Sequence, residues 1–131
     1  MTASHIMIAD DSRAMRQMLK SSLQQMNPST VFTEAENGQE VLSALEKDVY
    51  DAIFLDINMP EMDGLDCLRE LRKKWHSVPV VMCTSNSQQK IVIEALSNGA
   101  NSYIVKPVSV AKISKALKAV TQPELCPLCG K

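Results

Sequence analysis

Hydrophobic and polar residues along this chain follow two periods that take turns. Short apolar runs, typical of buried strands, alternate with longer stretches in which apolar residues recur every three or four positions, as in amphipathic helices. The short runs predict five strands, over residues 6–9, 31–35, 51–55, 78–83 and 101–105. The longer stretches predict a helix after each strand, starting near Arg13, after Gly38, after Gly64, near Ile91 and after Ser109, a good N-cap.

Two of these helices carry a clear apolar stripe that predicts their buried face. The first stripe comprises Met15, Met18, Leu19, Leu23 and Met26, and the second comprises Leu65, Leu68, Leu71 and Trp75. A strand followed by a helix five times over predicts a doubly wound α/β fold. Such a fold is a parallel sheet with helices on both faces and right-handed crossovers.

Polar residues stand where four of the predicted strands end: Asp10 and Asp11, Asp56, Thr84 and Lys106. Ligands of parallel α/β sheets bind outside the carboxyl ends of the strands. Each residue also has a plainer interpretation alone. Aspartates favour turns, Thr84 is suited to cap the next helix, and Lys106 precedes a turn. Their joint occurrence favours a site for a divalent cation and a phosphoryl group.

Asp10, Asp11 and Asp56 together predict a metal site, because clustered carboxylates repel one another unless a cation joins them. Oxygen ligands of this kind suit Mg²⁺. Asp56 is then placed to act as a nucleophile on phosphorus and form an aspartyl-phosphate. The Lys106 ammonium and the Thr84 hydroxyl are suited to hold phosphoryl oxygens.

Length and charge narrow the class of protein. A chain of 131 residues suits one domain, and its formal net charge of −1 gives no reason to expect nucleic acid as a partner. No apolar run approaches the roughly 18 residues of a membrane span, and residues 1–4 lack the features of a signal peptide. We therefore expect a cytoplasmic protein, with no membrane partner, whose cysteines are thiols.

Taken together, these motifs are similar to those of the receiver domains of two-component response regulators. The residues that carry the resemblance are Asp10-Asp11-Ser12, residues 55–64 (LDINMPEMDG), Thr84, Gly99-Ala100 and Lys106-Pro107. The resemblance covers about residues 4–120, so we divide the chain into a receiver domain over residues 1–120 and a tail over 121–131. It implies a flavodoxin-like (βα)5 fold with strand order 2-1-3-4-5.

The resemblance also implies roles for the residues at the strand ends. Asp56 is expected to accept a phosphoryl group from the phosphohistidine of a sensor histidine kinase. Asp11, Asp56 and the main-chain carbonyl of Asn58 are expected to ligate Mg²⁺ directly, with Asp10 acting largely through water. Lys106 is expected to pair with the phosphoryl group.

A switch is implied in the same way. Thr84 is expected to move toward the phosphoryl oxygen, and the Tyr103 ring to turn into the space it leaves. This remodels the face made by the fourth helix, fifth strand and fifth helix, where an output protein binds. Without the resemblance, Tyr103 is read as an ordinary core aromatic. Asn58 and Asn86 are expected to tune the rate of dephosphorylation.

Residues 10–16 (DDSRAMR) resemble the chemotaxis branch of the family, which predicts a CheA-like kinase and the flagellar switch as partners. A phosphorelay intermediate and a regulator of an enzyme are the alternative outputs. We expect a monomer or weak dimer whose only chemistry is Mg²⁺-dependent self-phosphorylation and autodephosphorylation. A phosphohydrolase of the haloacid dehalogenase type is disfavoured, because it needs a second aspartate where Asn58 stands.

Two basic or cysteine-rich features leave alternatives open. Lys112, Lys115 and Lys118 form either a solvated face or a docking surface for an acidic segment. Cys126 and Cys129 resemble half of a zinc site, which needs four ligands. They are inert thiols, share zinc between two chains, or form a redox pair. In the second case the chain would be a non-phosphorylated scaffold that dimerises through its tail.

Overall fold

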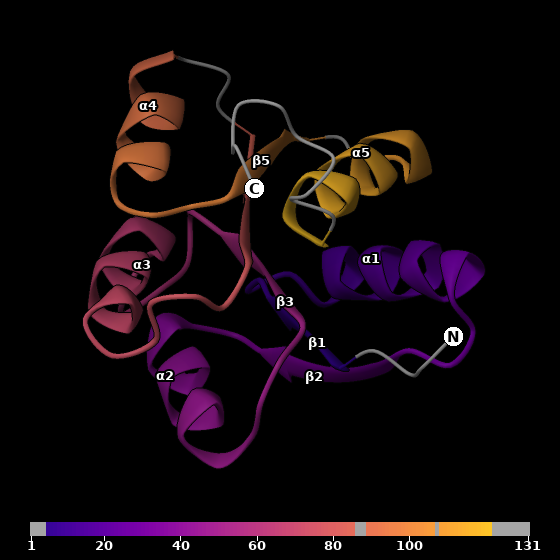
Figure 1. Cartoon of the computed structure of the whole chain (residues 1–131), viewed down its shortest axis with the longest axis horizontal. Coiled ribbons are helices and arrows are strands. Elements are labelled where there is room, and N and C mark those ends of the chain that lie inside the picture. Colours follow the sequence, from indigo (N-terminus) through magenta and orange to yellow (C-terminus); the bar gives the residue numbers. More distant parts are fainter. Residues whose placement is uncertain (1–4, 86–88, 107, 122–131) are drawn as a thin grey trace.

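Strands and helices alternate throughout the computed structural model, which describes residues 5–85, 89–106 and 108–121 (Figure 1). The strands are β1 (His5–Ala9), β2 (Val31–Ala35), β3 (Ala52–Asp56), β4 (Val80–Thr84) and β5 (Ser102–Val105). The helices are α1 (Arg13–Met26), α2 (Gly38–Lys47), α3 (Gly64–Arg72), α4 (Gln89–Ser97) and α5 (Val110–Thr121).

All five strands pair in parallel, in the order β2-β1-β3-β4-β5. The predicted doubly wound fold and its strand order are therefore confirmed. Because β1 lies between β2 and β3, the direction of winding reverses there. Helices α1 and α5 lie on one face of the sheet, and α2, α3 and α4 lie on the other (Figure 1).

The sheet separates two apolar cores, because successive side chains of a strand point to opposite faces. In β3, Ile53 and Leu55 pack in the core under α2 and α3, whereas Phe54 packs in the core under α1 and α5. All three side chains are fully buried. A strand buried on both faces is the reason that residues 52–55 form a continuous apolar run.

Side-chain caps fix the points at which the helices leave the loops. The Ser12 hydroxyl accepts the Met15 amide at 3.3 Å at the start of α1, and the Asp63 carboxylate accepts the Asp66 amide at 2.9 Å at the start of α3. Ser109 accepts the Lys112 amide at 3.2 Å, which confirms its predicted N-cap role. These caps satisfy amides that the helices leave unpaired.

The predicted buried stripe of α1 is wrong at one residue. Met18 has 48% of its surface exposed, whereas Arg16, a charged residue, is only 7% exposed. Met18 lies one position from Leu19 and so about 100° around the helix, outside the buried face. Arg16 precedes Leu19 and Leu23 by three and seven positions, so it lies on that face.

The third and fourth units also differ from prediction at their edges. Helix α3 ends at Arg72, so Trp75 lies beyond it, although its amide still donates to the Leu71 carbonyl at 2.7 Å. Strand β4 begins at Val80 rather than at residue 78. Pro79 lacks an amide to donate to a ladder, which favours a start after it. The strand also extends to Thr84, and β3 extends to Asp56, so both polar residues belong to the sheet itself.

No helix within residues 5–85, 89–106 and 108–121 is long and apolar enough to cross a membrane. Asn86, Cys126 and Cys129, to which the sequence assigned possible roles, lie outside the described residues.

Candidate functional site

The two central strands bring two aspartates together at the carboxyl edge of the sheet. Ala9 of β1 is in register with Leu55 of β3, so the next residues, Asp10 and Asp56, are neighbours across the strands. Asp10 is 1% exposed and Asp56 is 3% exposed, whereas Asp11 faces solvent. One oxygen from each of these three carboxylates lies within 4.8 Å of the others. The predicted acidic cluster is thus assembled.

Lys106, which follows β5, reaches across β4 to this cluster. Its ammonium Nζ donates to Asp10 Oδ2 at 3.1 Å and to Asp56 Oδ1 at 3.2 Å. The Lys106 amide donates to the Thr84 carbonyl at 2.7 Å, which continues the pairing of β4 with β5 and fixes the base of the side chain. A cation placed between two buried carboxylates offsets their mutual repulsion.

Burial dominates the ionisation of Asp56. The pKa of this carboxyl is raised from 3.8 to about 6. Burial is the main cause of the rise, and the negative charge of Asp10 is the second. Lys106 and the Asn58 amide act in the opposite direction, by charge and by hydrogen bonding to the carboxylate. The ionised form of Asp56 is therefore less favourable in this site than it would be in water.

The charges of the site do not balance. Burial lowers the pKa of Lys106, but Asp56 and Asp10 raise it by more, so the ammonium is favoured. Its one positive charge faces the negative charges of Asp10, Asp11 and Asp56. Three carboxylates and one ammonium leave two negative charges unbalanced, which is the charge that a divalent cation neutralises. Oxygen donors of this kind fit Mg²⁺.

Several contacts hold Asp10 besides the lysine. Its amide donates to the Ala35 carbonyl at 3.0 Å, and its Oδ1 accepts the Ser12 amide at 2.8 Å. Its carbonyl accepts from Nη1 of Arg16 at 2.6 Å. Sequence reasoning missed Arg16, because charged residues of amphipathic helices are normally assigned to solvent. The available signal was its helical spacing from Leu19.

The loop after Asp56 is tightly folded against the strand. The Met62 amide donates to the Pro60 carbonyl at 2.7 Å, and Glu61 between them has a φ of 67°, which together form a strained γ-turn. The Gly64 amide donates to the Ile57 carbonyl at 2.8 Å, and a Cβ on Gly64 would overlap the Asp56 carbonyl oxygen. Close packing of this loop holds Asn58, which is exposed, directly beside Asp56.

Thr84 and Tyr103 lie on the same face of the sheet. Thr84 is buried at the end of β4, and the Tyr103 side chain is 43% exposed on β5. The register pairs Met82 with Tyr103 and Thr84 with Val105, which makes Thr84 and Tyr103 diagonal neighbours. The tyrosine is therefore not an ordinary core aromatic in this structure.

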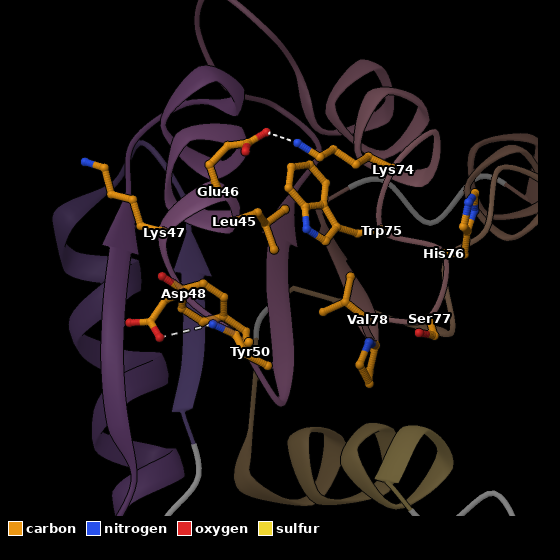
Figure 2. Close-up of a pocket in the computed structure, with 12 residues that line it drawn as sticks. Leu45, Glu46, Lys47, Asp48, Tyr50, Lys74, Trp75, His76, Ser77 and Val78 are labelled. Atoms are coloured by element: carbon orange, nitrogen blue, oxygen red, sulfur yellow. Dashed lines mark hydrogen bonds and ion pairs between the residues drawn. The ribbon is translucent and has the colours of Figure 1, made fainter.

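A hollow in the described part of the chain lies away from these residues. It has a volume of roughly 640 Å³ and lies between the ends of α2 and α3 and the loops that enter β3 and β4. Figure 2 shows Leu45, Tyr50 and Trp75 around this hollow, with an ion pair of Glu46 and Lys74 beside them. None of the strand-end carboxylates lines it, so hollow size does not locate the chemistry here.

Comparison with known proteins identifies a family that is consistent with this acidic site. Residues 6–118 match the family described as response regulator receiver domain. The chain is 38% identical to the chemotaxis protein CheY of Listeria monocytogenes over 113 residues, which are 86% of this chain and 94% of that protein. It is 36% identical to CheY of Bacillus subtilis over 115 residues, which are 88% of this chain and 95% of that protein.

A solved structure gives the same result for the fold. The chemotaxis protein CheY4 of Vibrio cholerae has a TM-score of 0.83 and 28% identity, covering 91% of this chain and 99% of that one. CheY-like receivers are signalling switches rather than classical enzymes, and receiver domains bind Mg²⁺ at an acidic pocket. With a family match over most of its length and the same fold, this chain belongs to the response regulator receiver domains and is a CheY-like receiver.

Proposed function

We propose that this chain is a phosphorylation switch in which Asp56 accepts a phosphoryl group from the phosphohistidine of a sensor histidine kinase. The observation that carries the proposal is the contact of Lys106 with both Asp10 and Asp56 within a cluster of three carboxylates. Phosphorylation and partner switching are general in the family. The identity of the kinase, the identity of the output partner and the cytoplasmic location of the chain are parts of this proposal.

Asp11, Asp56 and the main-chain carbonyl of Asn58 would hold Mg²⁺, with Asp10 acting through water. The donor set fits, because all of these ligands are oxygens and the carboxylates carry more charge than Lys106 neutralises. When bound, the ion supplies positive charge against the anionic oxygens of the phosphoryl group.

The residues of the chain divide the transfer between them. An Asp56 carboxylate oxygen forms the new bond to phosphorus as the bond from phosphorus to the imidazole nitrogen of the donor breaks. The nitrogen keeps the electron pair of that bond. Lys106 then releases one of its carboxylate contacts and donates to a phosphoryl oxygen, and the Thr84 hydroxyl donates to another. Such transfers depend on positioning and charge neutralisation more than on proton transfer.

The movement of Thr84 is the step that would transmit phosphorylation of Asp56 to the protein surface. Thr84 and Tyr103 are diagonal neighbours on one face of adjacent strands, so a movement of the hydroxyl toward the phosphoryl group opens space beside the ring. The exposed ring would then turn inward. We propose that this couples Asp56 to the face formed by α4, β5 and α5 as a shift between two populated states.

That face has the chemistry of a docking surface. Ile93, Leu96 and Tyr103 are large apolar or aromatic side chains exposed on it. A hollow of roughly 330 Å³ lies between β5 and α5, and Tyr103, Lys112 and Lys115 are among the residues that line it. Figure 1 shows β5 between α4 and α5. An acidic segment with apolar anchors would complement this surface.

We further propose that the output is of the chemotaxis type, with a CheA-like kinase as donor and the flagellar switch as target. The support is the name and similarity of the relatives, which are chemotaxis proteins that this chain spans almost completely. A phosphorelay intermediate and a regulator of an enzyme use the same chemistry and differ only in the partner.

The experiment that tests the proposal is Mg²⁺-dependent labelling with a small phosphodonor such as acetyl phosphate, read by intact mass. Wild type is expected to gain one phosphoryl group, and Asp56→Asn none, because an amide is not a nucleophile for this transfer. Asp51→Asn is the matched control. Asp51 lies just before the other end of β3, where its carboxylate accepts the His5 amide at 2.7 Å.

Equal labelling of wild type and Asp56→Asn would refute the assignment of Asp56. Absence of label on wild type, under conditions that label another receiver, would refute the switch and favour the scaffold interpretation.

A further inference from the structure

We propose that Arg16 is a positioning residue that holds the β1–α1 loop, which carries Asp10 and Asp11, in the shape that binds Mg²⁺. The inference rests on the proposed function, because it concerns the metal ligands of the same site. Arg16 touches neither the phosphoryl group nor the metal in this proposal. It acts through the main chain of Asp10.

Arg16 bonds to two separate parts of the chain. Its Nη1 donates to the Asp10 carbonyl at 2.6 Å in a buried position, and its Nε donates to Glu34 Oε1 of β2 at 2.7 Å. A third contact runs from Nη2 to Glu36 Oε2 at 3.8 Å. The guanidinium therefore ties the loop after β1 to the neighbouring strand from its place on α1.

The bond to the Asp10 carbonyl orients the peptide unit that leads directly to Asp11. That peptide is the point at which the chain turns from a buried carboxylate to an exposed one. Rotation of the peptide would move the Asp11 side chain relative to Asp56. Because groups that orient metal ligands affect affinity by about 10–100-fold, the contact is large enough to measure.

Position rather than charge is the dominant effect of Arg16. Its positive charge already faces the carboxylates of Glu34 and Glu36, and the pKa of Glu34 is lowered by hydrogen bonds from Lys20 and Arg16. Loss of the Arg16 cation alone would make the surroundings more negative and would strengthen cation binding. The positional effect has the opposite sign, so the two effects are separable by experiment.

A lysine is a poor substitute at this position. The planar guanidinium donates in two directions at once, to Asp10 and to Glu34. A lysine side chain is shorter and ends in one compact ammonium, which cannot reach both partners in this geometry. Arg16→Lys keeps the charge and loses the double contact. It therefore tests the placing of the loop with a smaller threat to folding than an apolar substitution.

The experiment is a calorimetric titration of the full chain with MgCl₂ alone, without phosphodonor. We expect Arg16→Met to raise the Mg²⁺ dissociation constant about tenfold and Arg16→Lys to raise it at least about threefold. Circular dichroism melts identify the temperature range in which each variant is folded, and the titrations are made within it.

Two control variants separate positioning from loss of charge and from loss of stability. Lys20→Met removes the cation that donates to Glu34 Oε2 at 2.8 Å but makes no contact with Asp10, and is expected to stay within about twofold of wild type. Leu23→Ala removes a fully packed side chain further along α1. It is expected to lower stability and leave the Mg²⁺ dissociation constant unchanged.

The outcomes are distinct. An unchanged dissociation constant in both Arg16 variants overturns the inference, as does wild-type affinity in Arg16→Lys or an equal loss in Leu23→Ala. If Arg16→Met does not fold, the comparison of Arg16→Lys with Lys20→Met still decides. A wild type that binds no Mg²⁺ overturns the proposed function and this inference with it. Binding by wild type that the Arg16 variants leave intact overturns the inference alone.

Discussion

The two edges of the sheet place their charges in opposite ways. At the carboxyl edge, Asp10 and Asp56 are buried and share one lysine, Lys106. At the amino edge, the ion pair of Glu46 with Lys74 is exposed and adjoins a hollow with apolar and aromatic residues (Figure 2). The amino edge offers an open hollow, and the carboxyl edge offers the chemistry.

The difference teaches where to look for function in this fold. A buried charge beside another charge of the same sign lowers stability. Such a pair is therefore a stronger sign of function than an open hollow. An exposed ion pair contributes little and requires no such explanation. The substitutions below compare the two edges, beginning with the largest expected effect.

Lys106→Ala is expected to lower the free energy of unfolding by about 2–3 kcal/mol at pH 7.5 without metal, because it leaves Asp10 and Asp56 buried without their cation. Denaturant unfolding measures the change. Addition of Mg²⁺ is expected to recover part of the loss. A loss that Mg²⁺ does not reduce would contradict the assignment of the cluster as a cation site.

Asp56→Asn is expected to stabilise the metal-free protein at pH 7.5 by about 1–2 kcal/mol. The pKa of Asp56 is raised from 3.8 to about 6 in the folded protein, chiefly by burial and then by Asp10. A group with a raised folded pKa contributes stability below its unfolded pKa and loses it as the pH rises through the folded value. Wild type therefore loses this contribution between about pH 4 and pH 7, and the variant does not.

Thermal melts at pH 4.5 and pH 7.5, with the metal removed by a chelator, measure this difference. The gain should be small at pH 4.5 and full at pH 7.5, and Mg²⁺ should reverse it. An equal gain at both values would show that Asp56 does not titrate as described.

Lys74→Ala, at the amino edge, is expected to change the free energy of unfolding by only about 0.5 kcal/mol. Its ion pair with Glu46 is exposed, and its ammonium lies 5.0 Å from the centre of the Trp75 ring. The Mg²⁺ dissociation constant, measured by calorimetry, should not move. A loss as large as that of Lys106→Ala would remove the contrast between the two edges.

Much of the site was predictable because parallel strands deliver their last residues to one edge. Placement at strand ends is enough to predict that Asp10, Asp11, Asp56 and Lys106 lie together. The order of the strands was not predictable in this way, since alternation of strand and helix does not say which strands are neighbours. It came from resemblance to the family, and the sheet confirms it.

The features that escaped prediction depend on contacts between distant residues. The helical spacing of Arg16 from Leu19 indicates the buried face, but not the distant partners that satisfy its charge there, the Asp10 carbonyl and Glu34. Met18 is exposed because it lies about 100° around α1 from Leu19, outside the buried face. Roles for Thr84 and Tyr103 remain predictions, although the register makes them neighbours.

The most direct test of the account is chemical trapping of the phosphorylated group after labelling with acetyl phosphate and Mg²⁺. Borohydride reduces an aspartyl-phosphate to homoserine, and peptide sequencing by mass spectrometry then locates it. We predict homoserine at position 56 in wild type and at no position in the Asp56→Asn variant. Homoserine at Asp10, Asp11 or Asp51 in place of Asp56 would contradict the account.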